Sequence, residues 1–375
     1  MRVILTGGGS GGHFYPLIAV ARSLKSITES RRIPGLELIY SSSEPYDAEL
    51  LREENIKFLK IPAGKIRRYF SLKNLIDPFR TFFGIIKGVW VIYLHYPDVI
   101  FAKGGYASFP TLFVAKILRI PVVVHETDTI PGKVTLWASK FAKRIAISFP
   151  ESAKYFPQNK IALTGNPVRK ELLMGTAERA QEVFNLEPGV PVILILGGSQ
   201  GSQKINDSIL DILKGLLEFS QVIHQTGENN FKGVELRAGI VLEGSSFSGR
   251  YHPEAFLDEE KMRDAFAAAS VIVMRPGGSV FEVAAKGIPA ILIPLPSSAQ
   301  DHQRENAYAY ARAGAADVLE EQNLTPHLFL GRIKSLLEDD ARKAKMIEAA
   351  KAFSKPDAAD KIADEIIRLT IAHGN

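Results

Sequence analysis

Length, composition and charge narrow the possible functions first. The chain has 375 residues, of which 46% are hydrophobic and 23% charged, so it can bury a core in each of two domains of ordinary size. It contains no cysteine, which excludes disulfides, zinc–thiolate sites, iron–sulfur clusters and cysteine nucleophiles. We expect neither a signal peptide nor a membrane-spanning helix, because residues 287–300, an uncharged stretch that prolines interrupt, fall short of the roughly 18 apolar residues that a span needs.

Short apolar runs alternate with helical patterns along the whole chain. The predicted strands of the first half are residues 3–6, 36–41, 58–61, 99–102, 122–125, 145–147 and 161–163. Those of the second half are 192–196, 221–224, 240–242, 271–274 and 290–293. The predicted helices include residues 17–27, 205–217 and 303–313, and residues 326–372 are helical as well. This alternation predicts parallel sheets covered by helices.

Each half opens with a strand, a glycine-rich turn and a helix. The first turn reads Gly7-Gly8-Gly9-Ser10-Gly11-Gly12-His13, and the second reads Gly197-Gly198-Ser199-Gln200-Gly201-Ser202. Such a turn presents backbone N–H groups and the positive end of a helix dipole to an anion. We therefore predict an α/β fold of two Rossmann-like domains facing across a cleft, with a boundary near residues 165–167 and ligands at the carboxyl ends of the strands.

Two familiar nucleotide signatures fit poorly. Gly7, Gly9 and Gly12 satisfy G-x-G-x-x-G, but the second strand ends in serines, and Glu44 lies only just beyond it. A dinucleotide-binding domain needs an acidic residue at the end of that strand, so an NAD-dependent oxidoreductase is disfavoured. Neither loop continues into Gly-Lys-Ser/Thr, which disfavours a P-loop.

Two further glycine turns follow predicted strands. One is Lys103-Gly104-Gly105-Tyr106, and the other is Arg275-Pro276-Gly277-Gly278-Ser279, with Glu282 one helical turn later. Any one of the four turns is equally well explained as an ordinary corner of the fold. Four together, with His13, Ser199, Glu282 and Gln303 on matching rims, favour a binding site.

The combined motifs resemble those of the MurG family, the N-acetylglucosaminyltransferases that complete lipid II. The further matching blocks are Pro16, His125-Glu126, Gly165-Asn166-Pro167-Val168-Arg169, Ala284-Ala285, Asp301-His302-Gln303 and Asn306-Ala307. The resemblance covers nearly the whole chain and implies the GT-B architecture. It implies an acceptor and membrane-facing domain at 1–166, a UDP-sugar domain at 167–352, and a C-terminal helix at 353–375 that can pack back on the first domain.

The resemblance also implies the substrates. UDP-N-acetylglucosamine would be the donor, and the 4-hydroxyl of the muramoyl sugar of undecaprenyl-diphospho-N-acetylmuramoyl-pentapeptide would be the acceptor, with inversion at the anomeric carbon. Three alternatives stay open: a UDP-N-acetylglucosamine 2-epimerase, a related transferase with another lipid acceptor, and a non-catalytic nucleotide-sugar binding subunit.

Residue roles follow from the same resemblance. Arg169 and the backbone near Leu257 would contact uracil, Glu282 the ribose, Ser199 and Gln200 the diphosphate, and Gln303 the sugar. The implied donor set is Ser10, Gly11, Gly12, Asp128, Arg169, Ser199, Gln200, Leu257, Gly278, Ser279, Glu282 and Gln303. The implied acceptor set is Gly8, Gly9, Gly104, Gly105, Tyr106 and Glu126. Asp128 stands where the family usually has an amide, so its contact with the sugar must change in character.

His13 is the candidate general base, because an imidazole titrates near neutrality. Its alternative roles are contact with a diphosphate or ordering of the loop. Asp128 and Glu126 are reserve candidates, whereas packing explains His125 better. The chain lacks Asp-x-Asp, and a helix N-terminus can stabilise a diphosphate by itself. We therefore expect no metal and no cofactor.

Charge is distributed unevenly between the two halves. Residues 1–166 carry 23 Lys+Arg against 12 Asp+Glu, and the remainder carries 23 against 29. A basic domain suits an anionic partner, and the lack of a basic–aromatic motif argues against nucleic acid. Residues 65–93 combine cations with apolar bulk, as an interfacial helix does; the membrane candidates are Phe79, Arg80, Phe82, Phe83, Lys87 and Trp90. A core helix is the alternative. We expect a cytoplasmic protein, peripheral on the anionic inner leaflet.

Overall fold

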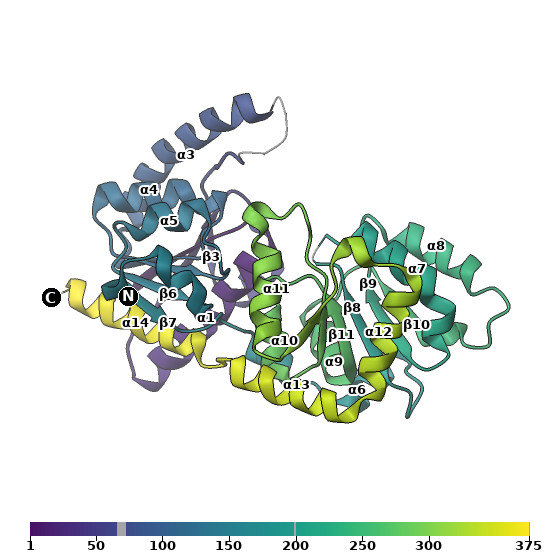
Figure 1. Ribbon diagram of the computed structural model, residues 1–375. Coiled ribbons are helices and arrows are strands. Elements are labelled where there is room, and N and C mark those ends of the chain that lie inside the picture. Colours follow the sequence, from purple (N-terminus) through teal and green to yellow (C-terminus); the bar gives the residue numbers. More distant parts are fainter. Residues whose placement is uncertain (66–72, 199, 375) are drawn as a thin grey trace. The chain divides into compact units, whose positions relative to one another are not determined.

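The computed structural model describes residues 1–65, 73–198 and 200–374, without the side chains of residues 73, 74, 299, 373 and 374. It divides into two compact units, Met1–Val168 with Lys355–Asn375, and Arg169–Ser354. These divisions fall two residues beyond the domain boundaries drawn from the sequence. Figure 1 shows the units with their elements labelled.

The first unit is built on a parallel sheet of seven strands in the order β3-β2-β1-β4-β5-β6-β7. The strands are β1 (Arg2–Thr6), β2 (Glu37–Ser42), β3 (Lys57–Lys60), β4 (Val99–Ala102), β5 (Val122–Glu126), β6 (Arg144–Ile147) and β7 (Ile161–Leu163). The helices are α1 (Gly11–Ser30), α2 (Ala48–Glu53), α3 (Lys73–His95), α4 (Phe109–Leu118), α5 (Lys133–Ser139) and α14 (Ala358–Gly374), with 3-10 turns η1 (Tyr106–Ser108), η2 (Pro150–Tyr155) and η3 (Gln158–Lys160).

Alternate residues of each central strand enter opposite cores. Val3 and Leu5 of β1 pack in a cluster with α1 and α14, whereas Ile4 packs in a cluster with residues of α4 and α5. Every residue of β4 and β5 is buried, as expected for a parallel sheet covered on both faces. The C-terminal helix α14 therefore completes the first unit, where Ser23 of α1 donates a 2.8 Å hydrogen bond to Asp360.

The second unit holds a parallel sheet of six strands in the order β10-β9-β8-β11-β12-β13. The strands are β8 (Val192–Leu196), β9 (Gln221–Gln225), β10 (Tyr251–Glu254), β11 (Ala269–Met274), β12 (Ala290–Leu292) and β13 (Ala316–Val318). The helices are α6 (Ala177–Phe184), α7 (Gln203–Leu217), α8 (Phe231–Val241), α9 (Glu259–Ala268), α10 (Val280–Lys286), α11 (His302–Arg312), α12 (Pro326–Glu338) and α13 (Asp340–Phe353). Its 3-10 turns are η4 (Lys170–Leu173), η5 (Ser248–Arg250), η6 (Ala299–Asp301) and η7 (Glu321–Asn323).

The strand order reverses once in each sheet, and each reversal marks the edge at which a ligand is expected to bind. In each sheet the chain first builds outward from a central strand and then returns to its other side, so the order reverses between β1 and β4 and between β8 and β11. Ligands of open α/β sheets bind at the carboxyl end of this reversal. Both glycine-rich turns predicted from the sequence leave these central strands, β1 and β8. The prediction of two α/β domains with parallel sheets is confirmed.

One predicted strand is wrong, and two strands were missed. Residues 240–242 belong to the end of α8 and its cap, where Ile240 is 66% exposed; three consecutive apolar residues do not distinguish a strand from one turn of a helix. The missed strands, β10 and β13, lie at the two edges of their sheet. β10 contains Pro253, and β13 contains Asp317. Edge strands tolerate such residues, but the residues interrupt the apolar pattern from which strands are predicted.

Candidate functional site

The first two glycine turns touch one another at the carboxyl edge of the first sheet. A Cβ at Gly9 would lie 2.8 Å from the ring of Tyr106, and a Cβ at Gly105 would lie 3.1 Å from the carbonyl oxygen of Gly8. Gly105 has a φ of 79°, which side-chain-bearing residues rarely adopt. The structure therefore brings together the predicted acceptor residues Gly8, Gly9, Gly104, Gly105 and Tyr106, which come from two segments about a hundred residues apart.

His13 stands at this junction, in the first turn of α1. Its Nδ1 lies 2.9 Å from Oγ of Ser10, and its Nε2 would lie 3.6 Å from a Cβ at Gly105. The hydroxyl of Ser10 thus orients the ring, while Nε2 faces the second glycine turn. Gly12 beside it is exposed, and Gly11 is buried. The helix α1 continues for 20 residues without an acidic residue in its first turn, so its N-terminus keeps a positive potential.

A buried lysine follows β4 directly. Lys103 is 2% exposed, and its Nζ lies 2.7 Å from Nδ1 of His125, 2.5 Å from Oγ1 of Thr127 and 2.8 Å from Oδ1 of Asn166. Burial lowers the pKa of Lys103 to about 7, against the attraction of Glu126 and Asp128. Lys103 was named only as the start of a glycine turn and was given no role from the sequence, although a lysine at the end of a wholly apolar strand is a visible signal.

Glu126 turns inward at the end of β5. Its Oε1 accepts the N–H of Asp128 at 3.0 Å, and its Oε2 accepts the N–H of Gly132 at 3.1 Å. Burial, followed by the neighbouring charge of Asp128, raises the pKa of Glu126 to about 7. Glu126 therefore shapes its own loop, whereas Asp128 is only half-buried. His125 is fully buried, with Nε2 2.9 Å from the carbonyl oxygen of Gly165, so it has the packing role expected from the sequence.

The glycine turn of the second unit leads into α7. Gly201 has a φ of 73°, and a Cβ there would lie 2.0 Å from the carbonyl oxygen of Thr226, so the turn requires glycine. Ser202 caps the helix by accepting the N–H of Ile205 at 3.4 Å. Of the two predicted diphosphate contacts, Gln200 is exposed in this turn, and Ser199 lies outside the described residues.

Arg275, which the site prediction left out, reaches back to this turn from the end of β11. Its Nη1 donates to the carbonyl oxygen of Ile293 at 2.9 Å, and its Nη2 donates to Oγ of Ser202 at 2.7 Å. Arg275 also forms an ion pair with Glu321 and is 8% exposed. The buried guanidinium of Arg275 therefore lies beside Ser202, the N-cap residue of α7.

Arg169 and Glu282 meet in a buried ion pair. Nε of Arg169 lies 2.8 Å from Oε1 of Glu282, and Nη2 lies 3.1 Å from Oε2; each residue is 7% exposed. Glu282 occupies the first turn of α10, which Ser279 precedes as the N-cap. The proposed uracil and ribose residues thus lie together, near the glycine pair to which Gly278 belongs.

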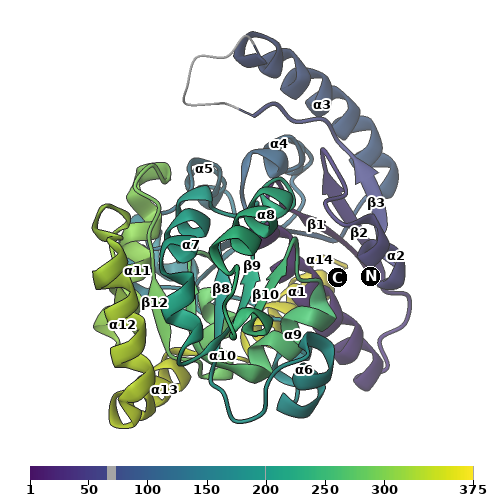
Figure 2. The same ribbon diagram turned by 90° about the vertical axis from the view of Figure 1, so that its right-hand side faces the viewer.

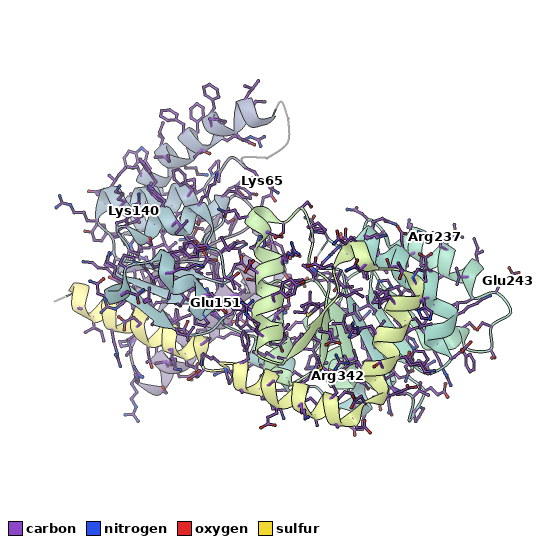
Figure 3. All side chains as sticks on the ribbon, in the orientation of Figure 1. Lys65, Lys140, Glu151, Arg237, Glu243 and Arg342 are labelled. Atoms are coloured by element: carbon purple, nitrogen blue, oxygen red, sulfur yellow. The ribbon has the colours of Figure 1, made fainter. Side chains whose placement is uncertain are left out.

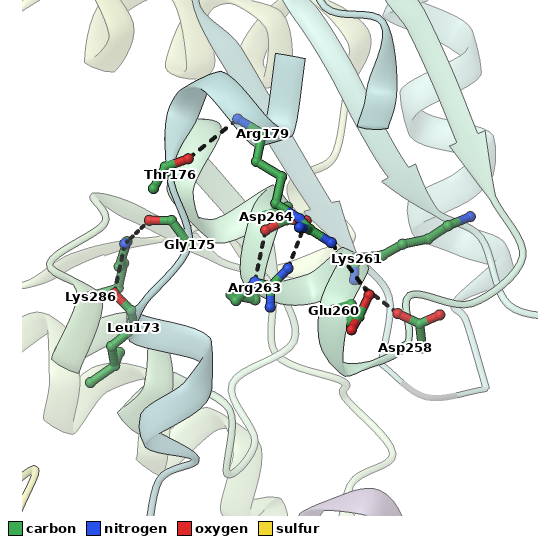
Figure 4. Close-up of polar contacts among 10 residues, drawn as sticks. All are labelled: Leu173, Gly175, Thr176, Arg179, Asp258, Glu260, Lys261, Arg263, Asp264 and Lys286. Carbon is green, nitrogen blue, oxygen red and sulfur yellow. Dashed lines mark hydrogen bonds and ion pairs between the residues drawn. The ribbon is translucent and has the colours of Figure 1, made fainter. Parts of the chain in front are cut away.

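Polar contacts fix the segments that carry this pair (Figure 4). Asp264 of α9 accepts from Arg179 of α6 at 3.1 Å and from Arg263 at 2.8 Å. Lys286 of α10 donates to the carbonyl oxygen of Leu173 at 3.1 Å, just after Arg169. These contacts join α6 to α9 and η4 to α10, so the segment that follows Arg169 is tied to the helix that carries Glu282.

The remaining donor candidates lie in one loop, at Leu257, and in the first turn of α11, at Gln303. The N–H of Leu257 donates to Oε1 of Gln225 at 3.0 Å, and Nε2 of Gln225 donates to the carbonyl oxygen of Gly198 at 3.1 Å. Gln225 therefore connects the predicted uracil segment to the diphosphate turn. Oε1 of Gln303 accepts the N–H of Leu295 at 3.0 Å, which leaves its amide nitrogen available at the start of α11.

The membrane candidates lie on one outward face of α3. Phe79, Arg80, Phe82, Phe83, Lys87 and Trp90 are all exposed. The opposite face holds Gly84 and Gly88, where a Cβ would meet Pro62 or Val114, so α3 packs closely through small residues. Figures 1 and 2 both show α3 on α4 at the outer side of the first unit. In the described part of the chain no helix is long and apolar enough to cross a membrane.

In residues 1–65, 73–198 and 200–374 no group of three or more histidine or carboxylate side chains could hold a metal ion. The expectation of a metal-free reaction remains a prediction.

Comparison with known proteins identifies the family. Residues 3–147 match the glycosyltransferase family 28 N-terminal domain, and residues 192–362 match the glycosyltransferase family 28 C-terminal domain. A protein of Treponema denticola, named UDP-N-acetylglucosamine--N-acetylmuramyl-(pentapeptide) pyrophosphoryl-undecaprenol N-acetylglucosamine transferase, is 37% identical over 96% of each chain. A Clostridium kluyveri protein with the same name is 35% identical, over 96% of this chain and 97% of its own.

Solved structures agree with this assignment. The crystal structure of Acinetobacter baumannii MurG superposes with a TM-score of 0.71 at 25% identity, over 98% of this chain and 99% of its own. A UDP-GlcNAc 2-epimerase from Neisseria meningitidis reaches 0.70 at 16% identity, over 98% of this chain and 100% of its own, and that likeness shows the fold alone. The sequence-based resemblance is confirmed: the chain belongs to the MurG family of UDP-sugar glycosyltransferases, within glycosyltransferase family 28.

Proposed function

We propose that this chain transfers N-acetylglucosamine from UDP-N-acetylglucosamine to the 4-hydroxyl of the muramoyl sugar of undecaprenyl-diphospho-N-acetylmuramoyl-pentapeptide, which converts lipid I to lipid II. The observation that carries the proposal is the similarity, along 96% of the chain, to a relative named as the N-acetylglucosamine transferase for this acceptor. It is supported by His13, which stands where the glycine turns after β1 and β4 touch.

The reaction is a single displacement. The acceptor oxygen attacks the anomeric carbon, the bond from that carbon to the β-phosphate oxygen breaks, and the electron pair leaves with UDP. His13 takes the hydroxyl proton on Nε2, while Ser10 holds Nδ1. A positioned base of this kind contributes about 10²–10⁴-fold to the rate. The acceptor diphosphate lies against the glycine turn that precedes α1, where backbone N–H groups suit an anion.

The donor binds to the second unit. Arg169 and the segment at Leu257 contact uracil, Glu282 binds the ribose hydroxyls, and Gln303 binds the sugar. The turn before α7 stabilises the negative charge that develops on the leaving diphosphate, because the dipoles of its N–H groups are fixed in place. No metal takes part in this scheme, so chelators leave the rate unchanged.

The enzyme works on the cytoplasmic face of the cell membrane. The exposed apolar face of α3 enters the headgroup region, and Arg80 and Lys87 attract anionic lipids of the inner leaflet. This placement suits an acceptor whose lipid tail stays in the bilayer. Nucleic acid is not a partner.

The test is to incubate the protein with radiolabelled UDP-N-acetylglucosamine and a short-chain lipid I analogue in excess EDTA. Transfer of label to the lipid supports donor, acceptor and metal independence together. If transfer requires added Mg²⁺, the metal-free mechanism is wrong. If label appears in the 2-epimer of the UDP-sugar when no lipid is added, the protein is an epimerase instead. If label reaches only a different lipid, the protein is a transferase with another acceptor.

A further inference from the structure

Lys103 carries a buried positive charge that the transfer mechanism above does not use. The hydrogen-bond partners of its ammonium are the imidazole of His125, the hydroxyl of Thr127 and the amide oxygen of Asn166. None of these groups is a carboxylate. Burying the charge of a lysine that is 2% exposed costs free energy unless an opposite charge lies near it. Charged groups that do not hydrogen-bond to the ammonium must therefore balance its charge.

These partners come from different strand ends. Lys103 follows β4 and donates its backbone N–H to the carbonyl oxygen of Thr6 at the end of β1, at 2.9 Å. His125 is the penultimate residue of β5, Thr127 follows the end of that strand, and Asn166 follows β7. One side chain thus joins the carboxyl ends of these strands at the edge that carries His13.

The opposite charge lies on Glu126 and Asp128. Both carboxylates attract the ammonium of Lys103, and they repel one another. Glu126 is directed inward by its hydrogen bonds to the N–H groups of Asp128 and Gly132, whereas Asp128 is half-buried at the rim. Asp128 is also the residue at which this chain carries a carboxylate where the family usually has an amide.

We propose that Lys103 is a positioning residue for the transfer: its ammonium holds the segment that follows β5 and balances the charges of Glu126 and Asp128, so that the Asp128 carboxylate can serve in place of an amide. The role in catalysis rests on the proposed function. Lys103 and Asp128 then form a coupled pair, and each is tolerated because the other is present.

The sign of the pH effect follows from the groups around Lys103. The titratable groups that face it are His125 and Glu126 at the end of β5 and Asp128 in the loop beyond. Removal of the positive charge favours protonation of the two carboxylates. Wild type gains the ammonium as the pH falls from about 8 to about 6, because the pKa of Lys103 is about 7, and Glu126 titrates in the same range. A variant that cannot carry the ammonium should therefore lose activity relative to wild type as the pH falls over this range.

The experiment is a double-mutant cycle on the transfer reaction. Lys103→Met should lower kcat/KM by about 10- to 100-fold, because misplaced side chains at a reaction rim cost that much. Asp128→Asn alone should lower it less. In the Lys103→Met/Asp128→Asn chain, activity should exceed the product of the two single effects by at least about threefold, and the extra loss at low pH should vanish. Lys140→Met removes an exposed lysine of the same unit (Figure 3) and should match wild type.

Independent, multiplicative effects of the two changes would overturn the proposal, as would wild-type activity and pH dependence in Lys103→Met. Thermal unfolding provides a second readout that needs no substrate: Lys103→Met should unfold at a lower temperature, and the added Asp128→Asn should recover part of the loss. If wild type fails to transfer, the proposed function fails while unfolding still decides the pairing. If Lys103→Met does not fold, failure of the double variant to fold as well refutes the charge balance.

Discussion

The guanidinium of Arg169 and the carboxylate of Glu282 form a two-point ion pair, with N–O distances of 2.8 and 3.1 Å, although 113 residues separate them in the chain. Glu259 lies 3.7 Å from the same guanidinium. Because both members of the pair are buried, each depends on the other for its charge balance. Arg169 and Glu282, which are expected from the sequence to contact the uracil and the ribose of the donor, thus depend on one another structurally.

Glu282→Ala should therefore impair both stability and donor use. The free energy of unfolding should fall by about 3 kcal/mol, at the low end for a broken buried pair because Glu259 remains. The KM for UDP-N-acetylglucosamine should rise, since the ribose hydroxyls lose the carboxylate to which they donate hydrogen bonds. Asp207→Ala breaks the exposed Arg237–Asp207 pair of the same unit and serves as the control, with little effect on either quantity. An unchanged KM in Glu282→Ala would contradict the ribose assignment.

His13→Ala separates the roles proposed for that residue. If the imidazole is the base, kcat should fall by about 10²–10⁴-fold while the KM of the lipid acceptor changes little. Ser10→Ala, which removes only the partner of Nδ1, should show a smaller loss in kcat. Steady-state kinetics with a lipid I analogue measures both. A raised acceptor KM at normal kcat would assign His13 to diphosphate binding instead.

Gly105→Ala tests the contact between the two glycine turns. Its Cβ would enter the space 3.1 Å from the carbonyl oxygen of Gly8, at a φ of 79°. Gly35 has a similar φ of 75°, but a Cβ there meets nothing within 4 Å. Both alanine variants should lose about 1 kcal/mol of stability from backbone strain, and only Gly105→Ala should lose transfer activity. Equal activity of the two variants would show that the turns need not touch.

Membrane binding should depend on α3. Phe79, Phe82 and Phe83 are 66%, 58% and 62% exposed, and each buried phenylalanine contributes about 1.5–3 kcal/mol. Changing all three to serine should weaken binding to anionic vesicles by at least about 100-fold in a sedimentation assay. Leu236→Ser with Ile240→Ser alters exposed apolar residues of α8 and should leave binding intact. Binding that survives the α3 change, or that does not weaken with added salt, would argue for another surface.

Acid should destabilise the second unit through His224. This side chain is fully buried, with Nδ1 2.9 Å from the Tyr251 hydroxyl and Nε2 3.1 Å from Oδ1 of Asn206, and burial lowers its pKa from 6.5 to about 3. The unfolded chain therefore binds a proton below pH 6.5 that the folded chain refuses, and stability falls as the pH drops toward 3.

The size of that loss is measurable. At pH 5 it amounts to about 2 kcal/mol for this one group. His224→Gln lacks the titration, so its stability deficit relative to wild type should shrink between pH 7.5 and pH 5 in urea unfolding followed by circular dichroism. A deficit that stays constant over this range would refute the assignment.

The sequence predicted the class of fold well, because the signals are local. A largely apolar strand followed by a glycine turn and a helix is visible within about 30 residues, and it recurs at β1–α1 and β8–α7. The same local information failed for β10 and β13, whose strand character comes from pairing with a neighbour rather than from their own residues.

The sequence by itself determined the two α/β domains, the positions of the glycine turns and the residue types available at the strand ends. Only the tertiary structure decided which of those residues meet. Contacts such as Gly105 with Gly8, Lys103 with Asn166 and Arg169 with Glu282 join segments 63 to 113 residues apart. Burial, which gives Lys103 and Glu126 their altered pKa values, likewise depends on neighbours that fold in from elsewhere in the chain.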